Sequence, residues 1–169
     1  RPRLPPKVSL ESRSESPVKL CPRNLVTVEN VIGGSGDDII VASDAVNELT
    51  GGEGDDFFVF KTVASTGLGS GRRDKILDFE VGDRIKIDEI SEEFETVFDE
   101  VFDDPGIRKF ILIAQAQEFS KPGQMRFKYD DRENSTILEG NIDYDTDTDF
   151  EIEIVGSHDL RYEQYLYSV

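Results

Sequence analysis

Glycine and aspartate recur at one fixed spacing in this sequence. The hexapeptide Gly-Gly-x-Gly-Asp-Asp occupies residues 33–38 and occurs again at residues 51–56, 18 residues later. Glycine lets the backbone adopt positive φ and turn its carbonyl oxygens inward, and aspartate adds carboxylate oxygens. Calcium prefers hard oxygen ligands of this kind, whereas zinc and copper sites use nitrogen or sulfur. The two turns therefore indicate a calcium site.

Each turn is followed by three apolar residues, at 39–41 and 57–59, so the repeating unit is nine residues long. Residues 42–50, between the two clear units, form a degraded third unit of the same length. If two units make one coil, equivalent turns stack on the same side of a parallel β-roll. Stacked strands lie about 4.7–4.9 Å apart, so an ion between two turns reaches oxygens of both. Ordinary glycine-rich hairpin turns would not need this equal spacing.

Composition excludes several other classes of protein. The chain has 169 residues with 36 acidic and 19 basic side chains, a formal charge of −17. This charge argues against nucleic acid and anionic membranes as partners and suits cations. Cys21 and His158 are the only residues of their kinds, which excludes an internal disulfide and a two-histidine zinc site. The sequence has no apolar run of membrane-span length and no signal-peptide core, so a secreted form needs another export signal or a longer chain.

Apolar patterns predict the elements that position the turns. Residues 1–24, rich in proline and serine, are expected to be a linker or a degenerate strand, residues 25–60 the roll, and residues 61–169 a capping β region. Apolar residues at helical spacing predict one amphipathic helix over residues 91–103. Strands are expected at 74–90, 109–116, 124–129, 136–140 and 150–156. The expected fold is mainly β: a short parallel β-roll capped by an antiparallel β-sandwich-like segment with one helix.

The repeated stretch resembles the nonapeptide repeat G-G-x-G-x-D-x-U-x, with U apolar, of RTX calcium-binding proteins. The order of further motifs is similar to the carboxy-terminal domain of the serralysin metalloproteases. This resemblance covers about residues 25–169 and is carried by Thr27-Val28-Glu29-Asn30, Ala42-Ser43-Asp44-Ala45-Val46-Asn47, Asp74-Lys75-Ile76-Leu77-Asp78-Phe79 and the segment GNIDYDTDTDF at 140–150.

The resemblance implies three calcium sites. The first joins the two clear turns and takes its ligands from Gly34, Gly36 and Asp38 on one side and Gly51, Glu53 and Asp56 on the other. Thr27 and Glu29 match a second site, whose usual upstream turn is missing from the sequence. A third site combines Ser43, Ala45 and Asn47 with Gly52, Gly54 and Asp74. Asp78 is a further candidate ligand.

An acidic turn near the end of the chain leaves two alternatives open. Asp143, Asp145, Asp147 and Asp149 alternate along the sequence as ligands do in a calcium loop. Thr146 stands where such a loop usually has glycine. The turn is either a further calcium site, with Asp143, Asp145 and Asp149 as ligands, or a solvated acidic turn.

The proteases that this sequence resembles carry a His-Glu-x-x-His zinc motif, which the chain lacks. No catalytic residue is therefore assigned. The hypothesis of an enzyme that uses paired acids, such as Asp130 and Asp131, is supported only by their place in a surface turn. The resemblance implies instead a calcium-binding module of a secreted, extracellular bacterial protein. Such a module folds on calcium binding, supports secretion and stability, and serves an upstream catalytic or adhesive domain in a longer chain.

Two further readings stay open. The family couples such modules to type I secretion through an uncleaved carboxy-terminal signal, of which Glu163, Tyr165, Leu166, Tyr167 and Val169 are a loose version; they are equally compatible with an ordinary last strand. The alternative function is calcium-dependent binding of polysaccharide or cell surfaces, as in the modules of alginate epimerases and adhesins. The tight basic cluster of Arg72, Arg73 and Lys75 is its support.

Overall fold

The computed structural model describes residues 8–9, 30–87, 110–160 and 166–167 of the chain. These residues form two β-sheets, of eight and four strands, together with a short 3-10 helix, η1 (Val63–Ser65). The amphipathic helix expected at residues 91–103 lies outside the described residues. Within the described ranges, no helix is long and apolar enough to cross a membrane.

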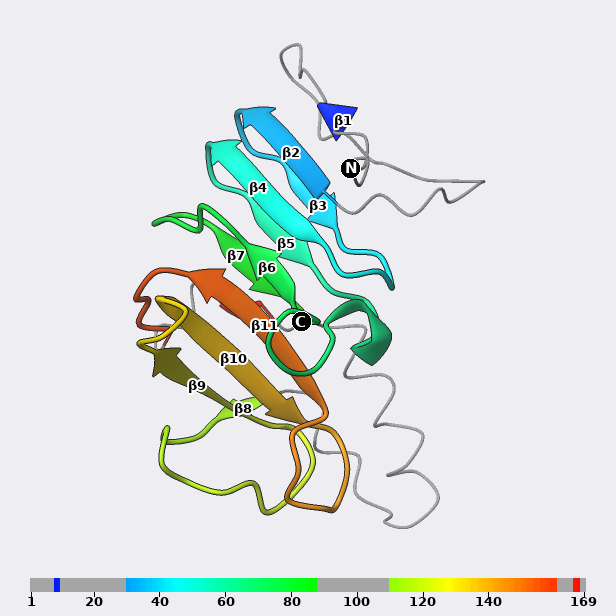
Figure 1. Cartoon of the computed structure of the whole chain (residues 1–169), viewed down its shortest axis with the longest axis vertical. Coiled ribbons are helices and arrows are strands. Elements are labelled where there is room, and N and C mark those ends of the chain that lie inside the picture. Colours follow the sequence, from blue (N-terminus) through cyan, green and yellow to red (C-terminus); the bar gives the residue numbers. More distant parts are fainter. Residues whose placement is uncertain (1–7, 10–29, 88–109, 161–165, 168–169) are drawn as a thin grey trace, which may run out of the picture.

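Six short strands wind into a parallel β-roll (Figure 1). The larger sheet contains β2 (Asn30–Ser35), β4 (Glu48–Glu53) and β6 (Asp74–Ile76), and the smaller sheet contains β3 (Ile39–Val41), β5 (Phe57–Val59) and β7 (Arg84–Lys86). Gly34 pairs with Gly52 and Ile40 with Phe58, which is the register that the 18-residue repeat requires. The expected parallel β-roll is confirmed, and β6 and β7 add a coil beyond residue 60.

Alternation within the apolar triplets fills the interior of the roll. Successive side chains of a strand point to opposite faces. The central residues Ile40, Phe58 and Ile85 are at most 4% exposed, whereas the flanking Ile39 is 44% exposed. The buried side chains pack in one cluster with Leu49 of the facing sheet. The roll is therefore held together by about one large apolar side chain per strand, which leaves a thin core.

A second group of strands, here called the cap, continues the larger sheet beyond the roll. β11 (Phe150–Val155) pairs in parallel with β6 and antiparallel with β10 (Ser135–Asn141), which pairs antiparallel with β9 (Gln124–Asp130). The short β8 (Ile111–Leu112) pairs in parallel with β9. The expected antiparallel segment is thus present, and Figure 1 shows it following the roll along the long axis of the molecule.

One predicted strand differs in length from the observed strand. The apolar run at 109–116 forms a strand of only two residues, β8, in its described part. The Gln117 N–H donates to the Ala114 carbonyl oxygen at 2.9 Å and closes a turn there. This turn, at residues 115–116, ends the strand before the end of the predicted run.

Short strands near both ends of the sequence extend the sheets. β1 (Val8–Ser9) pairs in parallel with β2, and β12 (Leu166–Tyr167) pairs in parallel with β7. β1 lies within residues 1–24, and β12 lies within residues 163–169, for which the sequence left a secretion signal and an ordinary last strand open. Both segments therefore contribute a strand to the roll.

Close packing of Phe150 explains a glycine in the cap. A Cβ built on Gly140 would lie 2.1 Å from two ring carbons of Phe150, which is fully buried. The Phe110 ring meets the same ring edge to face, with 5.6 Å between the centroids. Gly140 is therefore required by the space that Phe150 occupies in the core.

We expect Gly140→Ala to lower the free energy of unfolding by about 1–3 kcal/mol, because the added methyl group overpacks the core. Urea unfolding of the wild type and the variant in the same buffer measures the difference. Adding Phe150→Leu should restore part of the loss, since the smaller side chain makes room. Equal stability of wild type and G140A would contradict this account of the packing.

Candidate metal centre

Three turns stack along one side of the roll, at residues 33–38, 51–56 and 78–83. The Asp38 N–H donates to Asp56 Oδ1 at 2.8 Å, and the Asp56 N–H donates to Asp83 Oδ1 at 3.0 Å. Each of these aspartates directly precedes a strand of the smaller sheet, β3, β5 or β7. Asp38, Asp56 and Asp83 therefore form one column of carboxylates, here called the aspartate column.

Asp83 is a residue that the repeat spacing does not predict. It follows Asp56 by 27 residues rather than 18, because a longer loop that contains η1 precedes β6. Its turn also begins with Asp78 where the other two turns have glycine. The feature of the sequence that still points to Asp83 is the pair Gly82-Asp83, which is followed by a triplet with an apolar central residue, Ile85, buried in the structure.

The aspartate column is buried. Asp38 is 9%, Asp56 0% and Asp83 2% exposed. Asp56 Oδ2 has no hydrogen-bond partner among the described residues, and none of the ion pairs found there includes a member of the column. Burial of a carboxylate is unfavourable unless positive charge or hydrogen-bond donors compensate it. The orphaned oxygen therefore marks a place suited to a cation.

Glycines allow the carboxylates to lie against the turns. A Cβ on Gly51 would lie 2.1 Å from Asp56 Oδ2, and a Cβ on Gly33 would lie 2.6 Å from Asp38 Oδ2. Gly36 and Gly54 have φ of 117° and 133°, a region that other residues rarely adopt. Any side chain at Gly33 or Gly51 would fill the space that the carboxylates occupy.

Electrostatic repulsion acts along the column. The pKa of Asp56 is raised to about 6, first by burial and then by three neighbouring aspartates, against the Asp38 N–H, which lowers it. Burial also raises the pKa of Asp83. A cation between the turns would favour the ionised carboxylates and reverse both shifts.

Asp78 connects the second and third turns. Its two carboxylate oxygens accept the Gly51 N–H at 2.9 Å and the Gly52 N–H at 3.0 Å. The Glu80 N–H donates to Asp83 Oδ2 at 2.9 Å. The gap between these turns thus brings together Asp56, Asp78 and Asp83, of which the sequence predicts only the first two as ligands.

A separate cluster lies at the other end of β4. The Asn47 N–H donates to Asp74 Oδ1 at 2.9 Å, and Asn47 Oδ1 accepts the Ser43 N–H at 2.9 Å. The Ala45 carbonyl oxygen accepts Asn47 Nδ2–H at 2.5 Å. Asp74 is 1% exposed, its Oδ2 has no partner among the described residues, and burial raises its pKa to about 7. This end of the roll is a second place suited to a cation.

The structure separates two residues from this cluster and leaves two others untested. Gly52 is the fifth residue of β4 and Gly54 follows the last one, whereas Asn47 precedes the first residue of the strand. Residues 48–51 of the strand therefore lie between Asn47 and Gly52, and because a strand rises about 3.3 Å per residue, one ion does not reach both. Thr27 and Glu29 lie outside the described residues.

The acidic turn near the cap directs its carboxylates to its own backbone. Asp143 Oδ1 accepts the Asp145 N–H at 2.9 Å, and Asp149 Oδ2 accepts the Ile142 N–H at 2.6 Å. Asp145 Oδ1 accepts the Asp147 N–H at 2.8 Å. Each of these carboxylates therefore has one oxygen bonded to the backbone of the turn, and the two alternatives for Asp143, Asp145 and Asp149 stay open.

Across the described residues, no group of three or more His, Cys, Asp or Glu side chains is arranged to hold a metal ion. A cation between the turns must therefore draw a large part of its ligands from main-chain carbonyl oxygens. The glycine-rich turns and the orphaned oxygen of Asp56 fit this requirement, because calcium accepts backbone carbonyl ligands.

The profile of the family described as Peptidase M10 serralysin C terminal matches residues 20–164, and the chain belongs to this family. No curated protein matches the sequence significantly. Among solved structures, the chain is similar to the AlgE6R2 subunit of the Azotobacter vinelandii mannuronan C5-epimerase, with 19% identity and a TM-score of 0.49. That alignment covers 82% of this chain and 80% of the other. The family match confirms the resemblance that the sequence motifs predict.

The raised pKa values of Asp56 and Asp74 predict how stability depends on pH without calcium. Their folded pKa values of about 6 and about 7 lie above the ordinary 3.8. The folded protein therefore binds more protons than the unfolded chain between these values, and its stability falls as pH rises through that window. Circular dichroism in chelator should therefore show a larger folded fraction at about pH 5 than at about pH 7.5.

The matched controls for this experiment are Asp56→Asn and Asp131→Asn. D56N removes one titrating group from the column and should reduce the fall in stability. D131N removes an exposed acid of the β9–β10 hairpin and should leave the fall unchanged. Wild-type stability that stays level or rises over this range would contradict the electrostatics described above.

Proposed function

We propose that this chain is a calcium-binding RTX module of a secreted bacterial protein, which folds when calcium binds and thereby supports secretion and stability. The observation that carries the proposal is the orphaned Oδ2 of Asp56, which is fully buried within a column of carboxylates. A cation at this point compensates charge that no basic side chain of the described residues neutralises. Membership of the serralysin carboxy-terminal family supports the same conclusion.

The first ion lies between turns 33–38 and 51–56 in this proposal. Asp38 and Asp56 supply the carboxylates, and the remaining oxygens come from the carbonyl groups of Gly34, Gly36, Gly51 and Glu53. The Glu53 carbonyl oxygen accepts the Gly36 N–H at 2.5 Å. A carbonyl oxygen has two lone pairs, so this bond leaves one for a cation.

A second ion lies between turns 51–56 and 78–83. Asp56, Asp78 and Asp83 supply negative charge there, and Gly52 and Gly54 belong to this gap rather than to the cluster around Asn47. The charge of Asp56 interacts with Asp38 on one side and with Asp78 and Asp83 on the other, so we place its carboxylate next to both gaps and expect it to contribute to both ions. The cluster of Ser43, Ala45, Asn47 and Asp74 is a third candidate position.

Calcium binding at these positions changes stability at extracellular concentrations. Extracellular calcium modules bind with Kd of roughly 10⁻⁴ to 10⁻³ M. A site with Kd of about 10⁻⁴ M stabilises the folded state by about 1.4 kcal/mol at about 1 mM calcium, and by almost nothing at sub-micromolar calcium. Because the core of the roll is thin, two or three such sites decide whether it folds.

This difference in calcium concentration fits export in an unfolded state. The module stays loose inside the cell and folds outside, where calcium is abundant. Residues 25–60 begin the calcium-binding roll, residues 61–169 complete and cap it, and the carboxy-terminal end supplies the type I secretion signal. A catalytic or adhesive domain in a longer chain is the cargo, and the module itself performs no catalysis.

Polysaccharide binding, the alternative function, draws little support from the basic cluster. Arg73 contacts three glutamates, Glu133, Glu151 and Glu153, at 2.7–3.4 Å. Lys75 contacts Glu153 at 2.7 Å. Arg73 and Lys75 thus neutralise acids of the protein itself, which leaves Arg72, whose side chain is exposed, as the member of the cluster that faces solvent.

Calcium titration calorimetry of the full chain and of Asp56→Asn tests the proposal. Because Asp56 faces both gaps, D56N should weaken calcium binding about tenfold or more at two positions, since calcium affinity depends on the charge of the ligands. The Asp131→Asn variant should bind calcium like the wild type.

Circular dichroism of the same proteins reports the coupled folding. The calcium-free wild type should gain β-structure on addition of calcium and lose it again in chelator. A wild type that binds no calcium at millimolar concentration would refute the proposal. Equal weakening of calcium binding in D56N and D131N would show that the aspartate column does not bind the ion.

A further inference from the structure

Two buried glutamates lie on β11, where the cap meets the roll. Glu151 is 9% and Glu153 is 1% exposed. Both point to the outer face of the larger sheet, opposite to Phe150, Ile152 and Ile154 of the core. A buried carboxylate without a cationic partner is strongly unfavourable, so the partners of these two residues decide when β11 is stable in the sheet.

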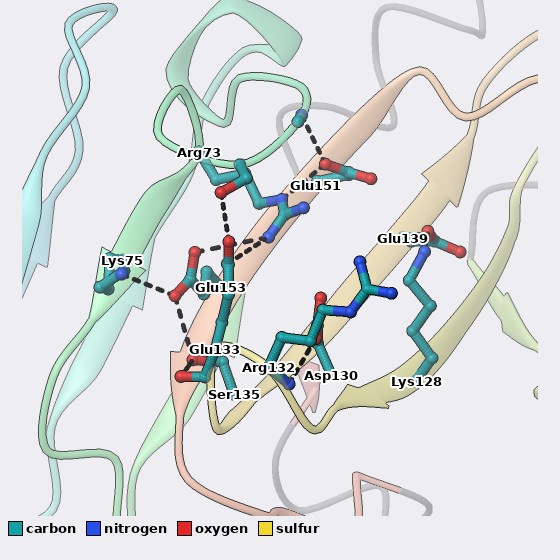
Figure 2. A network of polar contacts seen from close by, with 12 residues as sticks. Arg73, Lys75, Lys128, Asp130, Arg132, Glu133, Ser135, Glu139, Glu151 and Glu153 are labelled. Carbon is teal, nitrogen blue, oxygen red and sulfur yellow. Dashed lines mark hydrogen bonds and ion pairs between the residues drawn. The ribbon is translucent and has the colours of Figure 1, made fainter.

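The positive partners of both glutamates come from the roll (Figure 2). Arg73 Nε contacts Glu151 Oε2 at 2.7 Å, and Arg73 Nη1 contacts Glu153 Oε2 at 3.4 Å. Lys75 Nζ, on β6, contacts Glu153 Oε1 at 2.7 Å. In the described part of the chain, these are the ion pairs that Glu151 and Glu153 form. Arg73, Lys75, Glu151 and Glu153 are here called the clasp.

A glycine-containing loop of the roll completes the clasp. The Gly69 N–H donates to Glu151 Oε2 at 2.6 Å, and the Glu151 N–H donates to the Gly67 carbonyl oxygen at 3.1 Å. Gly67 and Gly69 have φ of 72° and 82°, which glycine adopts without strain. The loop before β6 therefore binds both the side chain and the backbone of Glu151, and these bonds require the folded conformation of the loop.

The third buried glutamate of this sheet is neutralised differently. Glu139, on β10, is 2% exposed and contacts Arg126 at 2.7 Å and also Lys128. Both cations belong to β9, the adjacent strand of the same hairpin. The two cations lower the pKa of Glu139 despite its burial, which by itself raises it. The hairpin thus satisfies its own charge, whereas β11 depends on the roll.

β6 is the element that links the two parts. Ile76 pairs with Leu49 of β4 on one side and with Ile154 of β11 on the other. The turn at residues 78–83 is separated from the end of β6 by one residue, so we expect order in that turn to hold the strand in place. When the turns are loose, Arg73 and Lys75 are not held at the edge that β11 needs.

We propose that the clasp makes folding of the cap conditional on the folded roll, so that calcium bound in the turns also controls the cap. This inference rests on the proposed function, because calcium must order the roll. It assigns to Glu151 and Glu153 the role of keeping the cap open until the roll supplies its cations.

Hydrogen exchange measured by mass spectrometry on the full chain tests the clasp, with and without calcium. In chelator, wild-type peptides of β9, β10 and β11 should exchange as fast as those of the roll. The variant Glu151→Gln/Glu153→Gln needs no cations, and its cap peptides should exchange at least tenfold more slowly than those of the wild type in chelator. Glu139→Gln, whose charge is balanced within the hairpin, should behave like the wild type.

A second variant tests the clasp even if Glu151→Gln/Glu153→Gln does not fold. Arg73→Met/Lys75→Met leaves both glutamates without cations, so in calcium its cap should exchange at least tenfold faster than the wild-type cap, while the turns at 33–38 and 51–56 stay protected. A wild-type cap that stays protected in chelator while the roll opens would overturn the clasp. So would a cap that remains protected in R73M/K75M. Turns that do not respond to calcium at all would instead overturn the proposed function.

Discussion

The backbone N–H groups of Asp38 and Asp56 each donate to an aspartate carboxylate of the following turn. These hydrogen bonds fix the position of each turn relative to the next one in the stack. The same bonds bring three buried carboxylates into one column. Hydrogen bonds from N–H groups satisfy part of this charge, but one oxygen of Asp56 has no described partner. The roll therefore depends on positive charge that its own described side chains do not supply.

The cap and the roll handle buried acids in different ways. In the cap, Glu139, Glu151 and Glu153 each meet arginine or lysine within hydrogen-bonding distance. In the roll, the aspartates face glycine and each other. Where the protein has basic partners it uses fixed ion pairs, and where it has none we infer a bound ion.

The sequence predicts most of the roll because its repeat has a physical meaning. Equal spacing of the turns at 33–38 and 51–56 requires equal coils, and the structure shows the corresponding register. The repeat does not predict Asp83, because a longer loop interrupts the 18-residue spacing and Asp78 stands where the other turns have glycine. The pairing of Gly52 with Asn47 fails because spacing along the chain does not say at which end of a strand a turn lies. The acidic turn shows the same limit, since alternation alone does not say whether carboxylates point to one ion or to their own backbone.

Anomalous diffraction from crystals grown in millimolar calcium tests the central claim most directly. The account predicts strong anomalous peaks in the gap between residues 33–38 and 51–56 and in the gap between residues 51–56 and 78–83, each next to the Asp56 carboxylate. Stacked turns with no peak in either gap, or calcium bound only elsewhere on the molecule, would contradict it.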